Sequence, residues 1–390
     1  MKEIFLEVAH AQERKHGQAT CGDVFISRRD EASGRIIACL ADGMGSGVKA
    51  NILATMTATM ALKFVESHMD IVHAAEIIRD SLPVCSVRKI GYSTFTIVDH
   101  MPGEPTRVIE MGNPPLMVFA GDELRNPQYE EIEDPKTPDG GMRIYRIQTR
   151  PQDRLVVISD GVSQAGLGTE AYPLGWRVES CRDFALECIE EDRNISASAL
   201  SRRIVRKANS KDLHHHPGDD TTCGVFYYRE PRKLLVCTGP PYDRKRDRDI
   251  ARMVRDYDGR VAICGGTTAE IVARELERPL KMDLSQRNAG LPPMSKMEGV
   301  NLVAEGILTL TRVQQLMERG GGGYDESGPS LMTNLLLDSD EIEFIVGTRI
   351  NEAHQDPSLP EDIEIRRNII KNITRILKER HLKKATVRYV

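Results

Sequence analysis

The chain has 390 residues, more than one hydrophobic core usually organises, so two or three domains of roughly 150 residues are expected. Its 53 lysines and arginines against 58 aspartates and glutamates give a formal net charge of −5. This balance argues against a protein held mainly by nucleic-acid phosphates or by an anionic membrane surface. With 40% hydrophobic and 28% charged residues, the composition is typical of a globular chain and not of a disordered one.

The first residues and the cysteines both indicate an intracellular protein. Charges interrupt every apolar run of MKEIFLEVAHAQERKHG, which is unlike a signal peptide. The longest uncharged apolar stretch, residues 52–62, is far shorter than the roughly 20 residues of a membrane-spanning helix. The eight cysteines form no CxxC pair, and several lie in apolar runs, which favours buried free thiols over zinc sites or disulfides. We therefore expect a cytoplasmic protein.

The first 230 residues alternate strand-like and helix-like segments. Apolar runs predict strands at residues 35–41, 92–98, 107–110, 116–120, 154–159 and 223–228. Ile52, Met56, Met60 and Phe64 recur every four residues and predict a helix over residues 48–66. A pair of helices is expected between residues 179 and 209.

The pattern changes near residues 229–232, where we predict a domain boundary. Beyond it, strands at 233–238, 260–264 and 341–347 alternate with helices at 247–256, 267–276 and 360–381, which indicates a smaller α/β domain with parallel strands. A loop over residues 318–329 contains four successive glycines, Gly320 to Gly323. The predicted domains are residues 1–230 and residues 231–390.

Three acidic motifs stand at strand ends in the first domain. Asp42 follows RIIACLA and opens DGMGSG, Asp160 follows RLVVIS and opens DGV, and Asp219 opens DDTT just before CGVFYY. Carboxylates at the ends of several strands can converge on one site while the sheet holds their backbones rigid. Oxygen ligands suit Mg²⁺ or Mn²⁺, and such a carboxylate cluster would repel itself without a cation. The carbonyl of Gly43 is a further candidate oxygen ligand.

Taken in order, these motifs resemble the metal-dependent 2C-type (PPM) serine/threonine protein phosphatases, and most of all the bacterial subgroup typified by the sporulation phosphatase SpoIIE. The element Cys21-Gly22-Asp23 resembles the early Gly-Asp of that family. The resemblance covers residues 1–230 and does not reach residues 231–390. It implies an α+β fold, an α-β-β-α sandwich of two antiparallel sheets flanked by helices, with two Mn²⁺ or Mg²⁺ ions at one edge.

The same resemblance implies roles for individual residues. Asp42 would bridge the two ions and Gly43 would offer its carbonyl, while Asp160 and Asp219 would hold one ion. Asp23 would orient the attacking water. The implied reaction is hydrolysis of phosphoserine or phosphothreonine on a regulatory protein, without a covalent phosphoenzyme.

Many members of the wider family grip the substrate phosphate with an arginine near the start of the chain. Arg14 and Lys15 lie in that region, and the sequence assigns the role to neither. The helix over residues 48–66 begins directly after Asp42, so a shift of this helix would move that carboxylate. We therefore expect an effector to change the apparent Mn²⁺ affinity.

Other functions stay open beside this one. DGMGSG alone also fits the DxGxG element of ATP-binding histidine-kinase-like folds, but those need an asparagine-bearing helix upstream and residues 1–41 contain no asparagine. A catalytically silent binding module, acting through its C-terminal domain, and a hydrolase of small phosphate esters are the two remaining alternatives.

In the second domain, two glycine turns each follow a strand and open a helix. They lie at Gly239 and at Gly265-Gly266-Thr267. Backbone N–H groups at such turns can cradle an anion, and the same turns also serve as ordinary connections in α/β folds. The expected partners are a phosphoprotein substrate, a small-molecule or protein ligand of the second domain, and a second copy of the chain in a homodimer. Neither nucleic acid nor a membrane is expected.

Overall fold

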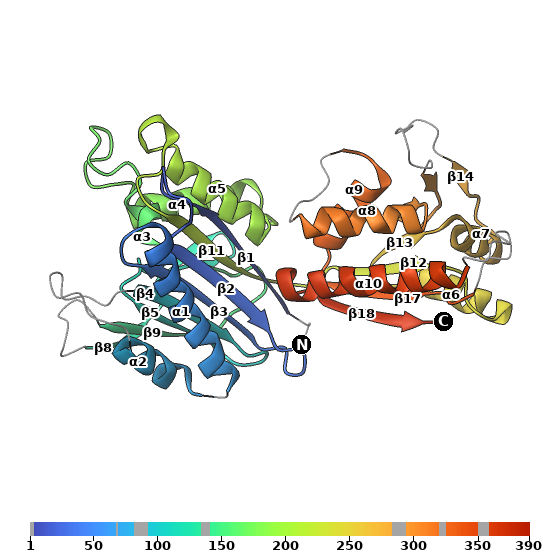
Figure 1. Ribbon diagram of the computed structural model, residues 1–390, viewed down its shortest axis with the longest axis horizontal. Coiled ribbons are helices and arrows are strands. Elements are labelled where there is room, and N and C mark those ends of the chain that lie inside the picture. The colour runs from blue at the N-terminus through green and yellow to red at the C-terminus, as the bar shows by residue number, and fades with distance from the viewer. Residues whose placement is uncertain are drawn as a thin grey trace. The chain divides into compact units, whose positions relative to one another are not determined.

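The computed structural model describes residues 4–67, 69–81, 93–133, 141–282, 294–319, 325–349 and 359–390. The tetraglycine segment, residues 320–323, lies outside these ranges. The chain forms two compact units, Met1–Glu230 and Pro231–Val390, each with its own sheets and helices (Figure 1). No helix in the described ranges has the length and apolar character that a membrane span requires.

Two antiparallel sheets form the centre of the first unit. One has the strand order β1-β11-β10-β6-β7 and the other β2-β3-β4-β5-β9-β8. The strands of the first sheet are β1 (Phe5–Glu13), β6 (Met117–Ala120), β7 (Glu123–Arg125), β10 (Arg154–Ile158) and β11 (Thr221–Arg229). Those of the second are β2 (Asp23–Arg29), β3 (Ile36–Gly43), β4 (Ser93–His100), β5 (Thr106–Met111), β8 (Tyr129–Ile132) and β9 (Met142–Ile147).

Helices cover the outer face of each sheet. Helices α1 (Gly47–Glu66) and α2 (Ile71–Ser81) pack on the second sheet, and α4 (Val178–Glu191) and α5 (Ala197–Asn209) pack on the first (Figure 1). Where the two sheets meet, the half-buried ring of Phe25 lies near the buried ring of Phe226, with their centroids 6.2 Å apart. The predicted α-β-β-α sandwich is therefore confirmed.

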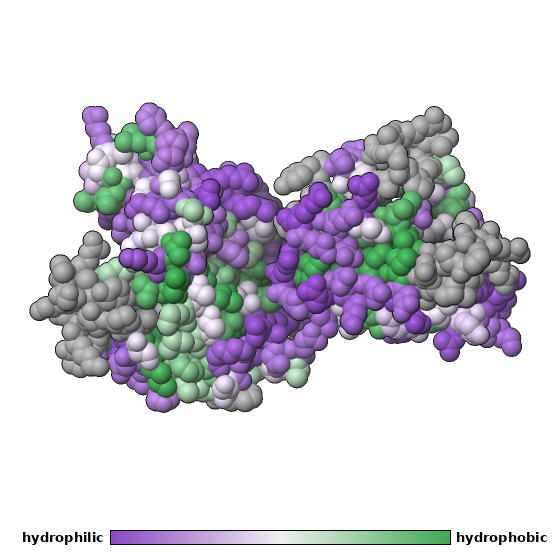
Figure 2. Space-filling view, viewed as in Figure 1, coloured by the Kyte–Doolittle hydropathy of each residue, from purple (hydrophilic) through white to green (hydrophobic). Residues whose placement is uncertain are grey.

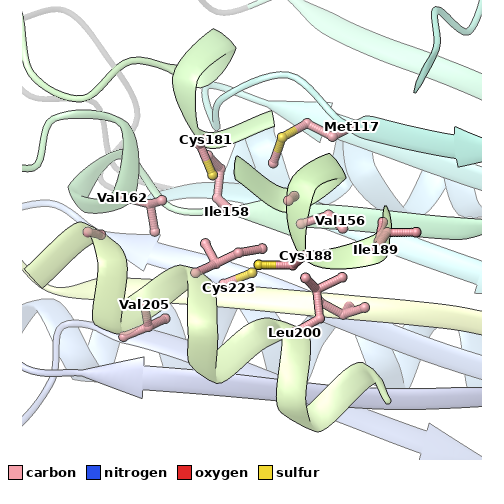
Figure 3. Packing of buried hydrophobic residues seen from close by; sticks show 14 of the residues in the cluster. Met117, Val156, Ile158, Val162, Cys181, Cys188, Ile189, Leu200, Val205 and Cys223 are labelled. Carbon is pink, nitrogen blue, oxygen red and sulfur yellow. The ribbon is translucent and has the colours of Figure 1, made fainter. Parts of the chain in front are cut away.

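The core between the first sheet and its helices contains three cysteines. Cys181 and Cys188 from α4 and Cys223 from β11 point into the same apolar cluster as Val156 and Leu200 (Figure 3). All three cysteines are buried free thiols, and burial raises the pKa of each. They pack as small apolar side chains.

Helix α1 forms where the four-residue spacing predicts it, but Ile52 and Met56, which belong to that spacing, do not lie on its buried face. Its buried side is made of small residues, including Ala50, Ala54 and Ala58, which let the helix lie close to β3. Ile52 and Met56 are instead more than half exposed, and Figure 2 shows green, apolar residues over this helix. The repeat thus predicts the helix, while its buried face is made of alanines, which allow a closer packing than larger side chains.

The second unit is built on a mostly parallel sheet with the order β14-β15-β16-β13-β12-β17-β18. Five strands run parallel, namely β12 (Lys233–Thr238), β13 (Arg260–Cys264), β16 (Leu302–Ala304), β17 (Glu341–Val346) and β18 (Lys384–Tyr389). The short strands β14 (Lys281–Met282) and β15 (Ser295–Lys296) add an antiparallel edge. The predicted parallel α/β arrangement is thus present, with a mixed edge.

Helices lie on both faces of this sheet. Leu235 and Cys237 of β12 pack with α6 (Asp247–Asp256) and α7 (Gly266–Glu275) on one face. Leu234 and Val236 pack on the other face with α8 (Ile307–Glu318), α9 (Gly328–Leu337) and α10 (Leu359–His381). Alternate residues of one strand thus enter two separate cores, so the strands read as continuous apolar runs.

Candidate metal centre

Three strand ends bring acidic residues to one cleft of the first unit. Asp42 and Gly43 end β3 in one sheet, while Asp160 follows β10 and Asp219 precedes β11 in the other sheet. All four residues line a single cleft of about 330 Å³. The remaining lining residues are Lys15, Met44, Gly45, Ser46, Ser93 and Thr94. The sandwich therefore brings together carboxylates that lie far apart in the sequence.

Two glycines allow the acidic turns to pack tightly. A β-carbon at Gly43 would lie 2.0 Å from the carbonyl oxygen of Ala50 in α1. A β-carbon at Gly161, directly after Asp160, would lie 2.1 Å from the carbonyl oxygen of Asp220. Any side chain at either position would push the backbone away, so the two Asp-Gly pairs depend on glycine for their geometry.

The carboxylates of the cleft raise one another's pKa. Burial raises the pKa of Asp42 well above its ordinary value, and the negative charges of Asp23 and Asp160 add to the effect. Burial likewise raises the pKa of Asp160, with Asp219 as the next cause. Removing these groups from water penalises their charged forms, and their mutual repulsion does the same. A bound cation would offset both penalties.

Asp23 lies beside the cleft and does not line it. In the pairing of β2 with β3 it stands directly opposite Asp42. Its side chain is only 1% exposed, and neither of its carboxylate oxygens has a hydrogen-bond partner in the described ranges. Burial raises its pKa to about 7 although the hydroxyls of Thr222 and Ser159 lower it, and the charges of Asp220 and Asp160 add to the rise. A buried carboxylate is costly unless a proton or a cation compensates it.

The donors of the cleft fit a hard divalent cation. Carboxylate and carbonyl oxygens are the ligands that Mg²⁺ and Mn²⁺ prefer, and the orphaned Asp23 lies next to them. Within the described ranges, no three histidine, cysteine, aspartate or glutamate side chains are already close enough together to enclose an ion. The carboxylates would therefore have to draw together around the metal.

Arg14 and Lys15 are the two basic residues to which the sequence could not assign a phosphate contact, and Lys15 is the one that lies at the cleft. Its ammonium nitrogen lies 3.7 Å from a carboxylate oxygen of Asp219, and its backbone N–H donates a 2.9 Å hydrogen bond to the buried carboxylate of Asp220. The guanidinium of Arg14 instead donates to the carbonyl oxygen of Ala19, at 3.0 Å. Of the two basic residues, only Lys15 lines the cleft. Asp220 thus positions the segment that carries it.

Sequence reasoning missed the polar residues that β4 adds to the cleft. Ser93 and Thr94 line it, and the hydroxyl of Thr94 donates to the side-chain carbonyl of Asn113 at 2.6 Å. Asn113 in turn donates to the hydroxyl of Thr96 at 3.0 Å. These residues lie in a stretch that reads as an ordinary strand, and only the pairing of β4 with β3 brings them beside Asp42.

The glycine turns predicted as anion sites belong to the second unit. Gly239 follows β12, and Gly265, Gly266 and Thr267 form the turn from β13 into α7. They are not part of the carboxylate cleft.

Comparison with known proteins matches the sequence of the first unit to a family. The family model for stage II sporulation protein E (SpoIIE) matches residues 32–229. Stage II sporulation protein E of Bacillus subtilis (strain 168) is 25% identical over 168 residues, which cover 43% of this chain and 20% of that protein. The chain thus spans about a fifth of the length of this curated relative.

Solved structures give similar matches. The PP2C phosphatase domain of SpoIIE from Bacillus subtilis, with a fragment of its regulatory domain, is 19% identical, with a TM-score of 0.47 over 59% of this chain and 65% of that chain. The catalytic domain of the serine/threonine phosphatase PstP, in complex with two manganese ions, is 15% identical, with a TM-score of 0.38 over 58% of this chain and 100% of that chain. Because the family model covers half of its residues, the chain belongs to the stage II sporulation protein E (SpoIIE) family.

Proposed function

We propose that the chain is a metal-dependent phosphatase that hydrolyses phosphoserine or phosphothreonine on a regulatory protein. The observation that carries this proposal is the convergence of Asp42, Asp160 and Asp219, from two different sheets, on one cleft. Family membership supports the same reaction. The second unit, outside the matched residues, would then regulate or recruit.

The groups in and beside the cleft would have different roles. Asp42, Asp160, Asp219 and the carbonyl of Gly43 would hold two Mn²⁺ or Mg²⁺ ions, which lower the pKa of water and offset charge on the phosphoryl oxygens when bound. Asp23 would orient the attacking water, and its pairing opposite Asp42 in β2 and β3 supports this role.

The rim of the cleft is open to a phosphate group. The side chains of Lys15 and Asp219 are 36% and 40% exposed, so a phosphate can reach the ammonium group from solvent. Lys15 would hold the phosphate by charge.

The enzymatic proposal is tested by hydrolysis of an aryl phosphate with and without Mn²⁺. We expect activity that requires the metal and falls by at least about a hundredfold in Asp42→Ala and Asp160→Asn, because each removes an oxygen ligand. Asp183→Asn, on an exposed part of α4, is the matched control and should leave the rate unchanged. Activity indifferent to the metal and to both substitutions would leave a catalytically silent binding module as the better description.

The substrate class needs a separate measurement. A panel of phosphoserine and phosphothreonine peptides is compared with nucleotides and sugar phosphates under the same metal conditions. We expect a higher kcat/KM for the peptides. Faster turnover of the small esters would favour a small-molecule phosphatase instead.

A further inference from the structure

The strand order of the second unit sets the carboxyl edge of its sheet apart. The chain leaves β12 toward α6 on one face and leaves the neighbouring strand β17 toward α10 on the opposite face. Two adjacent parallel strands whose connections diverge in this way form a topological switch point, where open α/β sheets bind ligands. A ligand of the second unit is therefore expected beside the residues that follow β12 and β17.

Glycines let the backbones of three strand ends meet at this edge. A β-carbon at Gly347, after β17, would lie 2.2 Å from the carbonyl oxygen of Gly239, after β12. Gly265, after β13, has a φ of 135°, and a β-carbon there would lie 4.0 Å from the backbone nitrogen of Gly239. Gly239 and Gly347 are buried, whereas Gly265 is partly exposed and Gly266 is exposed, so the peptide groups of the Gly265 turn are the ones that a small ligand can reach.

Two buried hydroxyl groups at this edge have no hydrogen-bond partner in the described ranges. Thr238, the last residue of β12, is fully buried, and Thr268, in the first turn of α7, is 1% exposed. The hydroxyl oxygen of Thr268 faces Gly265, since a β-carbon at that glycine would lie 3.4 Å from it. An unpartnered buried hydroxyl is unfavourable, so a ligand oxygen at the Gly265 turn would relieve this cost.

Two arginines lie near the ends of β12 and β17. Arg349 follows the Gly347 turn, its backbone N–H donates to the carbonyl oxygen of Pro240, and one of its terminal guanidinium nitrogens is buried without a partner in the described ranges. Arg366 of α10 reaches the other side, because a β-carbon at Gly239 would lie 2.7 Å from its guanidinium. Helix α7 starts here without an acidic residue in its first turn, so its positive end is not neutralised locally.

One acidic residue, Glu305 after β16, lies near this edge. It accepts a hydrogen bond from the backbone N–H of Leu308 at the start of α8, and burial together with its charge raises the pKa of the Cys264 thiol. The hydroxyl of Thr268 and the first-turn amides of α7 are donor groups beside the Gly265 turn.

We propose that the carboxyl edge of the second sheet binds the phosphate group of a small phosphorylated ligand. A phosphate presents several acceptor oxygens on a compact anion, which matches the hydroxyl of Thr268, the first-turn amides of α7 and the guanidinium of Arg349. A dinucleotide fits less well, because Gly239 is followed by two prolines, which have no N–H, and β13 ends in Cys264 where an acid would hold a ribose. This proposal does not depend on the phosphatase function.

The test is isothermal titration calorimetry on the full chain with inorganic phosphate and with pyrophosphate, in EDTA so that no divalent ion holds phosphate in the first unit. We expect saturable binding at one site per chain. Thr268→Val and Arg349→Gln should each weaken it at least about tenfold, because each removes a donor to an anion. Thr268→Ser keeps the hydroxyl and should bind like the natural chain, which separates loss of the donor from loss of folding.

Matched controls locate the binding site. Thr311→Val in α8 and Arg255→Gln on the exposed side of α6 should leave the affinity unchanged. Lys15→Ala, which removes the cation of the first-unit cleft, should also bind as well as the natural chain. The proposal fails if neither anion binds saturably up to about 10 mM, a range that still detects the weakest specific sites. It also fails if Lys15→Ala abolishes binding while Thr268→Val keeps it, since the anion would then sit in the first unit.

Discussion

Lys15 is the residue whose role in the first unit depends most on structure. It lines the carboxylate cleft, where its ammonium nitrogen lies 3.7 Å from a carboxylate oxygen of Asp219, and Asp220 fixes its backbone. Since its side chain is partly exposed, its pairing with Asp219 alone contributes little to stability. A role toward a phosphate dianion is the better account of this placement.

We expect Lys15→Ala to raise KM for an aryl phosphate by about tenfold and to change kcat less, because the lost contact is a charge-assisted one to the substrate phosphate. Steady-state kinetics at saturating Mn²⁺ measure both constants. Lys49→Ala, an exposed lysine in the first turn of α1, serves as the control. An unchanged KM in Lys15→Ala would assign the phosphate contact to other groups.

Glu110 of β5 is a buried acid outside the cleft. It is 1% exposed, accepts a 2.8 Å hydrogen bond from the hydroxyl of Tyr145, and lies 3.4 Å from the guanidinium of Arg143. Burial outweighs these favourable contacts and raises its pKa from 4.5 to about 7. The folded chain therefore holds this proton more tightly than the unfolded chain does.

The raised pKa of Glu110 therefore does not reduce the free energy of unfolding below pH 4.5. As the pH rises from 4.5 to about 7, the unfolded chain loses this proton first and the free energy of unfolding falls. Glu110→Gln should remove this dependence, so that the difference in unfolding free energy between the two chains changes by about 3 kcal/mol across the window. Urea unfolding at several pH values measures it. Glu104→Gln, at an exposed position, is the control, and parallel pH curves for the natural chain and Glu110→Gln would contradict the assignment.

At the scale of elements, helix α1 connects the metal ligands to the surface. Its alanine face lies on β3, and its first turns follow directly from Asp42 and Gly43. Its opposite face exposes Val48, Ile52 and Met56. A force on the exposed face would therefore reach the end of β3 through the close contact of Gly43 with Ala50.

This coupling predicts that overpacking under α1 weakens the apparent Mn²⁺ affinity. Ala54→Leu inserts methylene groups between α1 and the sheet at a cost of about 1–3 kcal/mol, which the helix can relieve only by shifting. Titration of activity with Mn²⁺ gives the affinity, and Thr55→Leu, on an exposed position of the same helix, is the control. A change confined to kcat, with the affinity unaltered, would show that α1 does not gate the metals.

The sequence predicted those elements whose residues carry a strong local signal. Strands β3, β10 and β12 are continuous apolar runs, and helix α10 has a clear apolar face, so each lies close to its expected range. Strand β1 was missed because polar and charged residues interrupt FLEVAHAQE, where only tertiary pairing with β11 supplies its partners. Short strand β16 has three residues, too few for any periodicity.

Residues of the candidate sites were likewise predictable only where a local sequence motif marks them. Asp42, Asp160 and Asp219 were predictable because each opens a short motif at a strand end. Thr268 and Arg349 were not, because nothing local distinguishes a buried threonine or arginine without a partner. Their significance comes from the strand order of the second sheet, which is a property of the assembled unit.

At the scale of the whole molecule, the two units have separate hydrophobic cores and therefore separate sources of stability. We expect two calorimetric transitions. Mn²⁺ at about 100 times its Kd should raise only the first unit's transition, by about 2.7 kcal/mol in unfolding free energy. Phe344→Ala, fully buried in β17, should lower only the other, by about 3–5 kcal/mol. One transition that responds to both changes would show that the units unfold together.

The buried cysteines make it possible to follow these openings one unit at a time. Among the described cysteines, only Cys21 is partly exposed, whereas Cys39, Cys181, Cys188 and Cys223 are buried in the first unit and Cys237 and Cys264 in the second. A thiol-alkylating reagent can reach the buried sulfurs only when the surrounding core opens, so the labelling rate of each site reports the frequency of local or global opening. Peptide mapping after brief labelling would then give the labelling rate of each native cysteine, and with it the opening frequency of each unit.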